Sequence, residues 1–225
     1  GHAGCLQMLL DAKVDVNTAS KYGETALMDA VAENRPEWVK MMITAKADID
    51  AKKYDGGFAL AMAAGFGCDA CLLLLLDAKA NVEAVDNNGT TALMDAAGGG
   101  NEICVQKLLD AKANVNATDR DSITALMFAA SQGHVSNARL LLYAKADVDA
   151  QNDLEKTALI VATEQGQISC VQLLVDSKAN IELKSKSGTT ALVIAEREGF
   201  DDIVNILSQA KTRAAPASAT PQAPH

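Results

Sequence analysis

Apolar residues recur along this chain at the spacing of one side of an α-helix. Val105, Leu108 and Leu109 occupy positions i, i+3 and i+4, which predicts a short helix with a single apolar stripe. The same triplet recurs at Val39, Met42 and Ile43 and at Val171, Leu174 and Val175. A helix with one apolar stripe needs a second element to cover that stripe.

A second pattern supplies this element and fixes the period of the chain. The segment Thr25-Ala26-Leu27 returns in steps of 33 residues without insertion or deletion, as Phe58-Ala59-Leu60, Thr91-Ala92-Leu93, Thr124-Ala125-Leu126, Thr157-Ala158-Leu159 and Thr190-Ala191-Leu192. A fixed period of this length predicts stacked repeats rather than one globular core.

Each repeat is expected to hold a short inner helix, which begins near the Thr-Ala-Leu segment, and the longer outer helix. One inner position is alanine in every unit, at Ala30, Ala63, Ala96, Ala129, Ala162 and Ala195. Because alanine lets helices approach closely, the inner row should pack more tightly than the outer row, and the stack should curve. Segments between units, such as residues 81–89, contain Asn, Asp and Gly, which predict a projecting hairpin.

These features resemble the ankyrin repeat over residues 1 to about 212. The unit at residues 84–116 matches the family pattern at Asp86, Gly89, Thr91, Leu93, Ala96, Ala97, Gly100, Leu108, Leu109, Ala113, Val115 and Asn116, and another unit supplies Gly133-His134. The resemblance implies an all-α fold with short β-hairpin loops, an ankyrin-repeat solenoid of helix-turn-helix units stacked in a curved array.

The period divides the chain into units. We expect an outer helix of a truncated N-terminal repeat, five full repeats, a C-terminal capping repeat and a Pro/Ala-rich tail, at 1–17, 18–50, 51–83, 84–116, 117–149, 150–182, 183–212 and 213–225. Because the first inner helix is missing, we expect the native protein to continue upstream. The tail is expected to need an external partner if it is ordered.

The chain departs from the family pattern in three ways. The proline of Thr-Pro-Leu-His is alanine throughout, and the histidine is replaced by apolar residues, so apolar packing must substitute for a side-chain hydrogen bond. The glycine that ends the outer helix is replaced by Lys13, Lys46, Lys79, Lys112, Lys145, Lys178 and Lys211. These lysines are interpreted as cations that neutralise helix C-termini, with an anion-binding row as the alternative. Ser122 and Glu155 replace tip glycines and predict altered hairpin tips.

Composition and charge limit the class of partner. The chain has 225 residues, of which 49% are hydrophobic and only 4% aromatic, which indicates a folded core of small aliphatic side chains. No apolar run approaches the ~20 residues needed to span a membrane. The net charge of -9 opposes binding to nucleic acid and favours a protein partner with a neutral or basic face.

The cysteines indicate a reducing intracellular compartment, with the cytoplasm favoured and an organelle interior as an alternative. Cys5, Cys71, Cys104 and Cys170 share one repeat position, so they are interpreted as buried free thiols. Trp38 occupies the same position and is expected to pack inward. Cys68 and Cys71 form a Cys-x-x-Cys motif, for which a redox role is the alternative to a structural one.

The sequence offers no catalytic constellation, and we expect neither an enzyme nor a bound cofactor or metal ion. The three histidines, His2, His134 and His225, lie far apart, and Gly98-Gly99-Gly100 lacks the lysine-serine pair of a phosphate loop. Asp201 and Asp202 stand where they would complement a helix N-terminus.

The resemblance instead implies binding of another protein through hairpin tips and the concave inner-helix face. Exposed aromatic and arginine side chains carry much of the energy of protein interfaces. The candidate anchors are therefore Tyr22, Tyr54 and Phe66, followed by Arg120, Ile123 and Leu154. The alternative is that the aromatic rings only cover hairpin backbones.

The function predicted is a protein-protein interaction scaffold or adaptor, with a fixed subunit of a larger assembly as a variant. The alternative is a regulatory segment of a longer enzyme whose catalytic domain is not in this chain.

Overall fold

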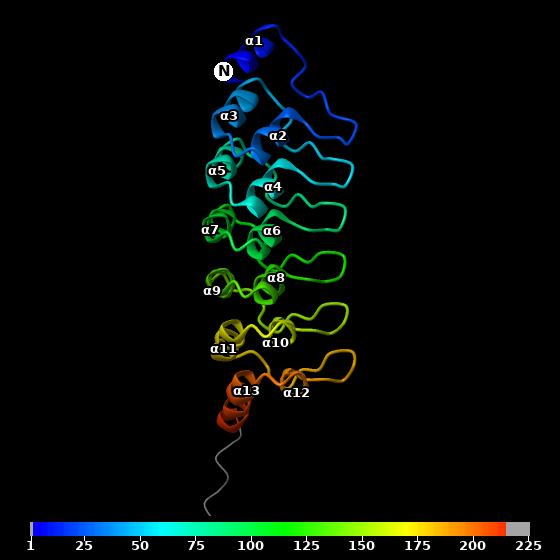
Figure 1. Ribbon diagram of the computed structural model, residues 1–225, viewed down its shortest axis with the longest axis vertical. Helices are drawn as coiled ribbons and strands as arrows, with labels where there is room; N and C mark the ends of the chain where they lie inside the picture. The colour runs from blue at the N-terminus through cyan, green and yellow to red at the C-terminus, as the bar shows by residue number, and fades with distance from the viewer. Residues whose placement is uncertain (1, 215–225) are drawn as a thin grey trace, which may run out of the picture.

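The chain forms a stack of helix pairs in a computed structural model (Figure 1). The structure describes residues 2–214, except for the side chains of Ala214 and of several residues in the first helix. The predictions for the side chains of His2 and Cys5, for His225 and for the tail beyond Ala214 lie outside the described residues.

Within residues 2–214 the helices form two parallel rows, with loops projecting to one side (Figure 1). The inner row contains α2 (Ala26–Ala32), α4 (Ala59–Phe66), α6 (Ala92–Gly98), α8 (Ala125–Gln132), α10 (Ala158–Glu164) and α12 (Ala191–Glu198). The outer row contains α1 (His2–Asp11), α3 (Pro36–Thr44), α5 (Asp69–Asp77), α7 (Glu102–Asp110), α9 (Val135–Tyr143), α11 (Ile168–Asp176) and α13 (Asp201–Ala214). The predicted all-α solenoid is confirmed.

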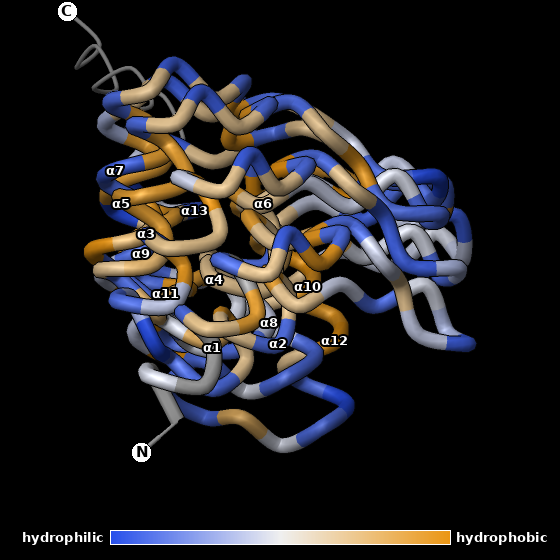
Figure 2. Tube along the Cα trace, turned by 90° about the horizontal axis from the view of Figure 1, so that it is seen from above, coloured by the Kyte–Doolittle hydropathy of each residue, from blue (hydrophilic) through white to orange (hydrophobic). Residues whose placement is uncertain are grey.

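The projecting loops are hairpins without extended strands. The described residues form isolated antiparallel bridges, Ala19 with Thr25, Lys52 with Phe58, Val85 with Thr91 and Thr118 with Thr124. Viewed along the stack, hydrophilic segments predominate on these loops, whereas apolar segments gather between the two helix rows (Figure 2).

Threonine starts most of the inner helices. The Thr124 hydroxyl accepts a hydrogen bond from the Met127 amide at 3.3 Å, and the threonines at 25, 91, 157 and 190 cap their helices in the same way. This bond satisfies an amide that a helix N-terminus leaves free. Phe58 has no capping oxygen, but its ring is buried in the core.

The inner row packs more closely than the outer row, as the row of alanines predicts. Each inner helix contacts its neighbours along the stack more extensively than the outer helices contact theirs. The alanines at this position are all buried. Apolar packing also replaces the missing histidines, because Met28, Ala61, Met94, Met127 and Ile160 are buried, although Val193 in the last repeat is exposed.

The lysines after the outer helices adopt the left-handed conformation expected of a helix-ending glycine. Lys112 has φ 71°, and its amide donates to the Leu109 carbonyl while the Ala113 amide donates to the Leu108 carbonyl, both at 3.0 Å. This pair of bonds is the Schellman motif, which satisfies the last carbonyls of the helix. Positive φ also occurs at Lys13, Lys46, Lys79, Lys145 and Lys178.

The prediction for Lys211 is wrong. Lys211 lies inside α13, and its Nζ is 3.3 Å from Glu182 Oε1. Lys211-Thr212-Arg213-Ala214 contains no residue that breaks a helix, so α13 continues through it.

The prediction of altered hairpin tips at Ser122 and Glu155 is also wrong for the backbone. Both residues have positive φ, 61° and 55°, like the tip glycines of the other repeats. Their amides donate to Asp119 and Asn152 carbonyls, as the Gly89 amide donates to Asp86. The side chains do differ, because Ser122 Oγ donates to Asp153 Oδ1 of the next hairpin at 2.6 Å.

Candidate functional site

The inner face, defined as the exposed side chains of the inner helices together with the hairpin tips, is continuous along the stack. Backbone hydrogen bonds join each tip to the next at N···O distances of 2.8–3.4 Å, from Tyr54 to Tyr22, Asn87 to Asp55, Arg120 to Asn88, Asp153 to Asp121 and Lys186 to Leu154. Such a ladder fixes the spacing of the tip side chains, so little ordering entropy remains to be lost on binding.

A second ladder of hydrogen bonds holds the repeats together behind the hairpins. The amides of Asp48, Asn81, Asn114, Asp147 and Asn180 donate at 2.7–2.9 Å to the side chains of Asn17, Asp50, Glu83, Asn116 and Asp149 in the preceding repeat. Polar residues at these positions therefore hold neighbouring repeats together, and we do not count them among the candidate partner-binding residues.

The three aromatic anchors predicted from the sequence lie exposed on the inner face. Tyr22 and Tyr54 occupy adjacent tips, and Tyr54 leaves 76% of its surface exposed. The Tyr54 ring also lies over Gly23, because a Cβ added there would be 3.2 Å from Tyr54 Cδ1. It thus covers a hairpin backbone and still offers most of its surface. Phe66, at the end of α4, is 65% exposed.

The other three candidates differ among themselves. Arg120 and Leu154 are exposed at the tips of the hairpins before α8 and α10. Ile123 is half-buried at the base of its hairpin and packs against the core, so it is less available than predicted. Tyr22, Tyr54, Arg120 and Leu154 lie along the same line of tips.

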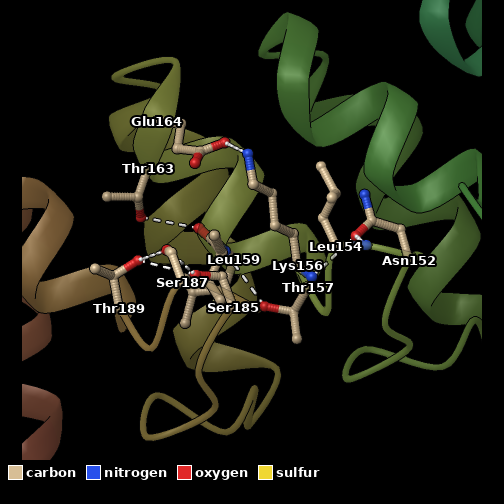
Figure 3. Close-up of polar contacts among 11 residues, drawn as sticks. Asn152, Leu154, Lys156, Thr157, Leu159, Thr163, Glu164, Ser185, Ser187 and Thr189 are labelled. Atoms are coloured by element: carbon tan, nitrogen blue, oxygen red, sulfur yellow. Dashed lines mark hydrogen bonds and ion pairs between the residues drawn. The ribbon is translucent and has the colours of Figure 1, made fainter.

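Towards the C-terminal end, the inner face carries charges that neutralise one another. Lys156 reaches from its hairpin to Glu164 on α10, with Nζ 2.8 Å from Oε2 (Figure 3). The Asn152 side chain holds the same tip, accepting from the Leu154 and Lys156 amides. Arg197 and Glu198 form a second pair.

The sequence reasoning missed one unusual group on the inner face. Asp95 on α6 is half-buried, and burial followed by the charge of Asp86 raises its pKa to about 7. At the equivalent position α4 has Met62 and α8 has Phe128, both half-buried. The available signal was an acidic residue where most other repeats have an apolar one.

The outer face also exposes apolar side chains that the sequence reasoning missed. Tyr143, at the end of α9, is 87% exposed and replaces the aspartate of Asp77, Asp110 and Asp176. Ile103 is exposed beside an open groove of about 620 Å³ between the outer helices, which Asn101, Lys107 and Leu140 also line. Ile103 and Tyr143 therefore provide exposed apolar side chains on the outer face that can be compared with those on the inner face.

The Cys-x-x-Cys motif has a structural environment. Cys68 and Cys71 are buried free thiols; burial raises the pKa of Cys68 and raises that of Cys71 to about 11, which opposes formation of a reactive thiolate. Cys68 Sγ donates to the Val31 carbonyl of the preceding repeat at 3.6 Å. Asn101, His134 and Gln167 make the equivalent bond in later repeats, so Cys68 occupies a framework position.

The other residues at the Cys71 position also face the core. Cys104 and Cys170 are buried free thiols, and burial raises their pKa values to about 12 and about 11. Trp38 packs against the core but is only half-buried, and the Arg35 guanidinium lies 5.6 Å from its ring centroid.

No group of three or more His, Cys, Asp or Glu side chains within the described residues is placed to hold a metal ion. In the part of the chain that the structure describes, no helix is long and apolar enough to cross a membrane.

Comparison with known proteins identifies the repeats. A family model of three ankyrin repeats matches residues 60–152 and 126–215, and a single ankyrin-repeat model matches residues 22–54. A comparison with curated proteins gives no match.

Proposed function

Because the chain belongs to the ankyrin-repeat family, we propose that it is a scaffold or adaptor that binds another protein through its hairpin tips and concave inner face. Ankyrin repeats are generally modules that bind other proteins. The observation that carries the proposal is the exposure of Tyr22 and Tyr54 on the ladder of hairpin tips and of Phe66 at the end of α4, in a chain with few aromatic residues.

The partner proposed is a protein with a neutral or basic face, which the chain binds either transiently as an adaptor or permanently as a fixed subunit of a larger assembly. We place it in a reducing compartment, with the cytoplasm favoured. Four buried cysteines without disulfides support this placement, because such thiols are typical of reducing compartments.

Affinity capture with matched variants tests the proposal. Loss of one exposed anchor should weaken partner binding by about thirtyfold, and loss of two by on the order of several hundredfold, since interface aromatics contribute on the order of 2 kcal/mol each. We expect Tyr54→Ala with Phe66→Ala to abolish recovery of the partner. The matched control is Ile103→Ala with Tyr143→Ala on the outer face, which should leave recovery unchanged. Recovery by the Tyr54→Ala, Phe66→Ala chain and loss of recovery by the control would show that the partner binds the outer helices instead.

A further inference from the structure

Asp95 is enclosed by apolar neighbours along the stack. It lies on α6 between α4 and α8, which pack directly against α6 and have Met62 and Phe128 at the equivalent position. Neither α4 nor α8 contains an ionisable residue. The carboxyl group therefore has no counter-charge on either neighbouring inner helix.

Two glycines leave this carboxyl group accessible from the inner face. A Cβ at Gly65 would lie 3.5 Å from Asp95 Cβ, and a Cβ at Gly98 would lie 3.6 Å from Phe128 Cδ1. A larger side chain at either position would extend over Asp95 or Phe128. Glycine at both positions keeps the carboxyl group and the ring open to a ligand, and the exposed Phe66 directly follows Gly65 at the end of α4.

No cation among the described residues forms an ion pair with Asp95. The ion pairs among the described residues are Lys53–Asp55, Lys107–Asp110, Lys156–Glu164, Arg197–Glu198 and Lys211–Glu182. The charged residue that acts on Asp95 is Asp86 in the preceding hairpin, which has the same sign. The charged residues of α7 belong to the outer row, on the other side of α6.

The negative charge extends along the N-terminal part of the inner face. Glu24 and Glu33 both act on Asp29, which occupies the position of Asp95 in the first full repeat, and they raise its pKa after the effect of burial. None of these three carboxylates forms an ion pair with a described residue. In the C-terminal part, Glu164 and Glu198 are paired with Lys156 and Arg197.

We infer that Asp95, Phe66 and Phe128 form a subsite for one lysine or arginine side chain of a basic segment of the bound protein. The cation pairs with the carboxylate, and its methylene stem lies against the two phenylalanine rings. A cation is attracted to an aromatic face, and long basic side chains bury their stems on apolar surfaces. This inference rests on the proposed function and specifies which partner chemistry the inner face selects.

Selection from a random displayed peptide library tests the subsite without a known partner. The library is selected against the full chain, against Asp95→Asn and against Asp77→Asn, a control that removes the same charge from the exposed end of α5. Peptides selected by the wild type and by Asp77→Asn should share a Lys or Arg at one position. Peptides selected by Asp95→Asn should lack it.

A double-mutant cycle then assigns the contact. A selected peptide and its Lys→Gln form are titrated against wild type and Asp95→Asn. The wild type should bind the Gln peptide about tenfold more weakly, whereas Asp95→Asn should not distinguish the two peptides.

Two outcomes would overturn the subsite. One is selection of the same basic peptides by wild type and Asp95→Asn, and the other is the absence of an enriched basic position in the wild-type peptides. The proposed function fails separately, if the Tyr54→Ala, Phe66→Ala chain still recovers the partner in affinity capture and the outer-face variant does not, whichever peptides the Asp95 comparison selects.

Discussion

At the residue scale, Asp95 links stability to pH. Burial and Asp86 raise its pKa from the ordinary 3.8 to about 7, so between these values the folded chain retains a proton that the unfolded chain has lost. The free energy of unfolding should therefore fall as pH rises from about 4 to about 7, and the full penalty should remain above pH 7.

Asp95→Asn should remove this penalty. We expect the variant to be more stable than the wild type by about 1–2 kcal/mol at pH 8, because water partly screens the half-buried carboxylate, and to show little gain at pH 4. Urea unfolding at both pH values measures the difference, with Asp77→Asn as the charge control. An equal gain at both pH values would show that the effect does not come from ionisation.

Residue-scale features were predictable where a single residue determines its own environment. The left-handed lysines followed from their place after an outer helix, and the exposure of Tyr54 followed from its hairpin tip. The environment of Asp95 was not predictable, because it depends on Gly65 and Gly98 in two different helices. The structural interpretation of the Cys68-x-x-Cys71 motif agrees with the buried position of Cys68, whose thiol donates to the Val31 carbonyl of the preceding repeat.

At the element scale, the outer helices end in a Schellman motif with lysine in place of glycine. The Cβ of Lys112 in the left-handed region costs on the order of 1 kcal/mol, and its charge at the helix C-terminus returns about 0.3–1 kcal/mol. Strain and charge therefore nearly cancel, which explains how lysine can occupy this position in every repeat that is followed by another.

Two substitutions at Lys112 separate these effects. Lys112→Ala retains the strained Cβ and loses the charge, so it should lower the free energy of unfolding by about 0.3–1 kcal/mol. Lys112→Gly removes both the strained Cβ and the charge, so it should leave the free energy of unfolding nearly unchanged. Chemical denaturation measures both, and high salt should shrink the alanine effect by screening. A glycine variant less stable than the alanine variant would contradict this explanation.

The 33-residue period predicted the helices and hairpins well, because nearly every repeat contains its own threonine cap, apolar stripe and turn residues. The prediction failed at Lys211, in the last repeat. Lys211 was predicted to follow a helix by analogy with Lys178, but α13 continues to Ala214, because residues 211–214 contain no helix-breaking residue. Ser122 adopts the left-handed conformation that usually requires glycine, because the hydrogen bonds between neighbouring hairpin tips hold its backbone in place.

At the scale of the whole molecule, the stack separates two surfaces with different properties. The inner face joins fixed hairpin tips to exposed aromatic side chains and to unpaired carboxylates in its N-terminal part. The outer face exposes Ile103 and Tyr143 on separate helices. The sequence predicted which face to consider, but the pairing of charges within each half of that face depends on contacts between repeats.

Site-specific photo-cross-linking tests most directly whether the inner face binds the partner. A photoreactive phenylalanine analogue is placed at Phe66 on the inner face or at Tyr143 on the outer face of the full chain, and adducts are identified after irradiation. We predict that position 66 forms an adduct with one protein in stoichiometric yield and that position 143 does not. Adducts from position 143 with none from position 66 would contradict the account.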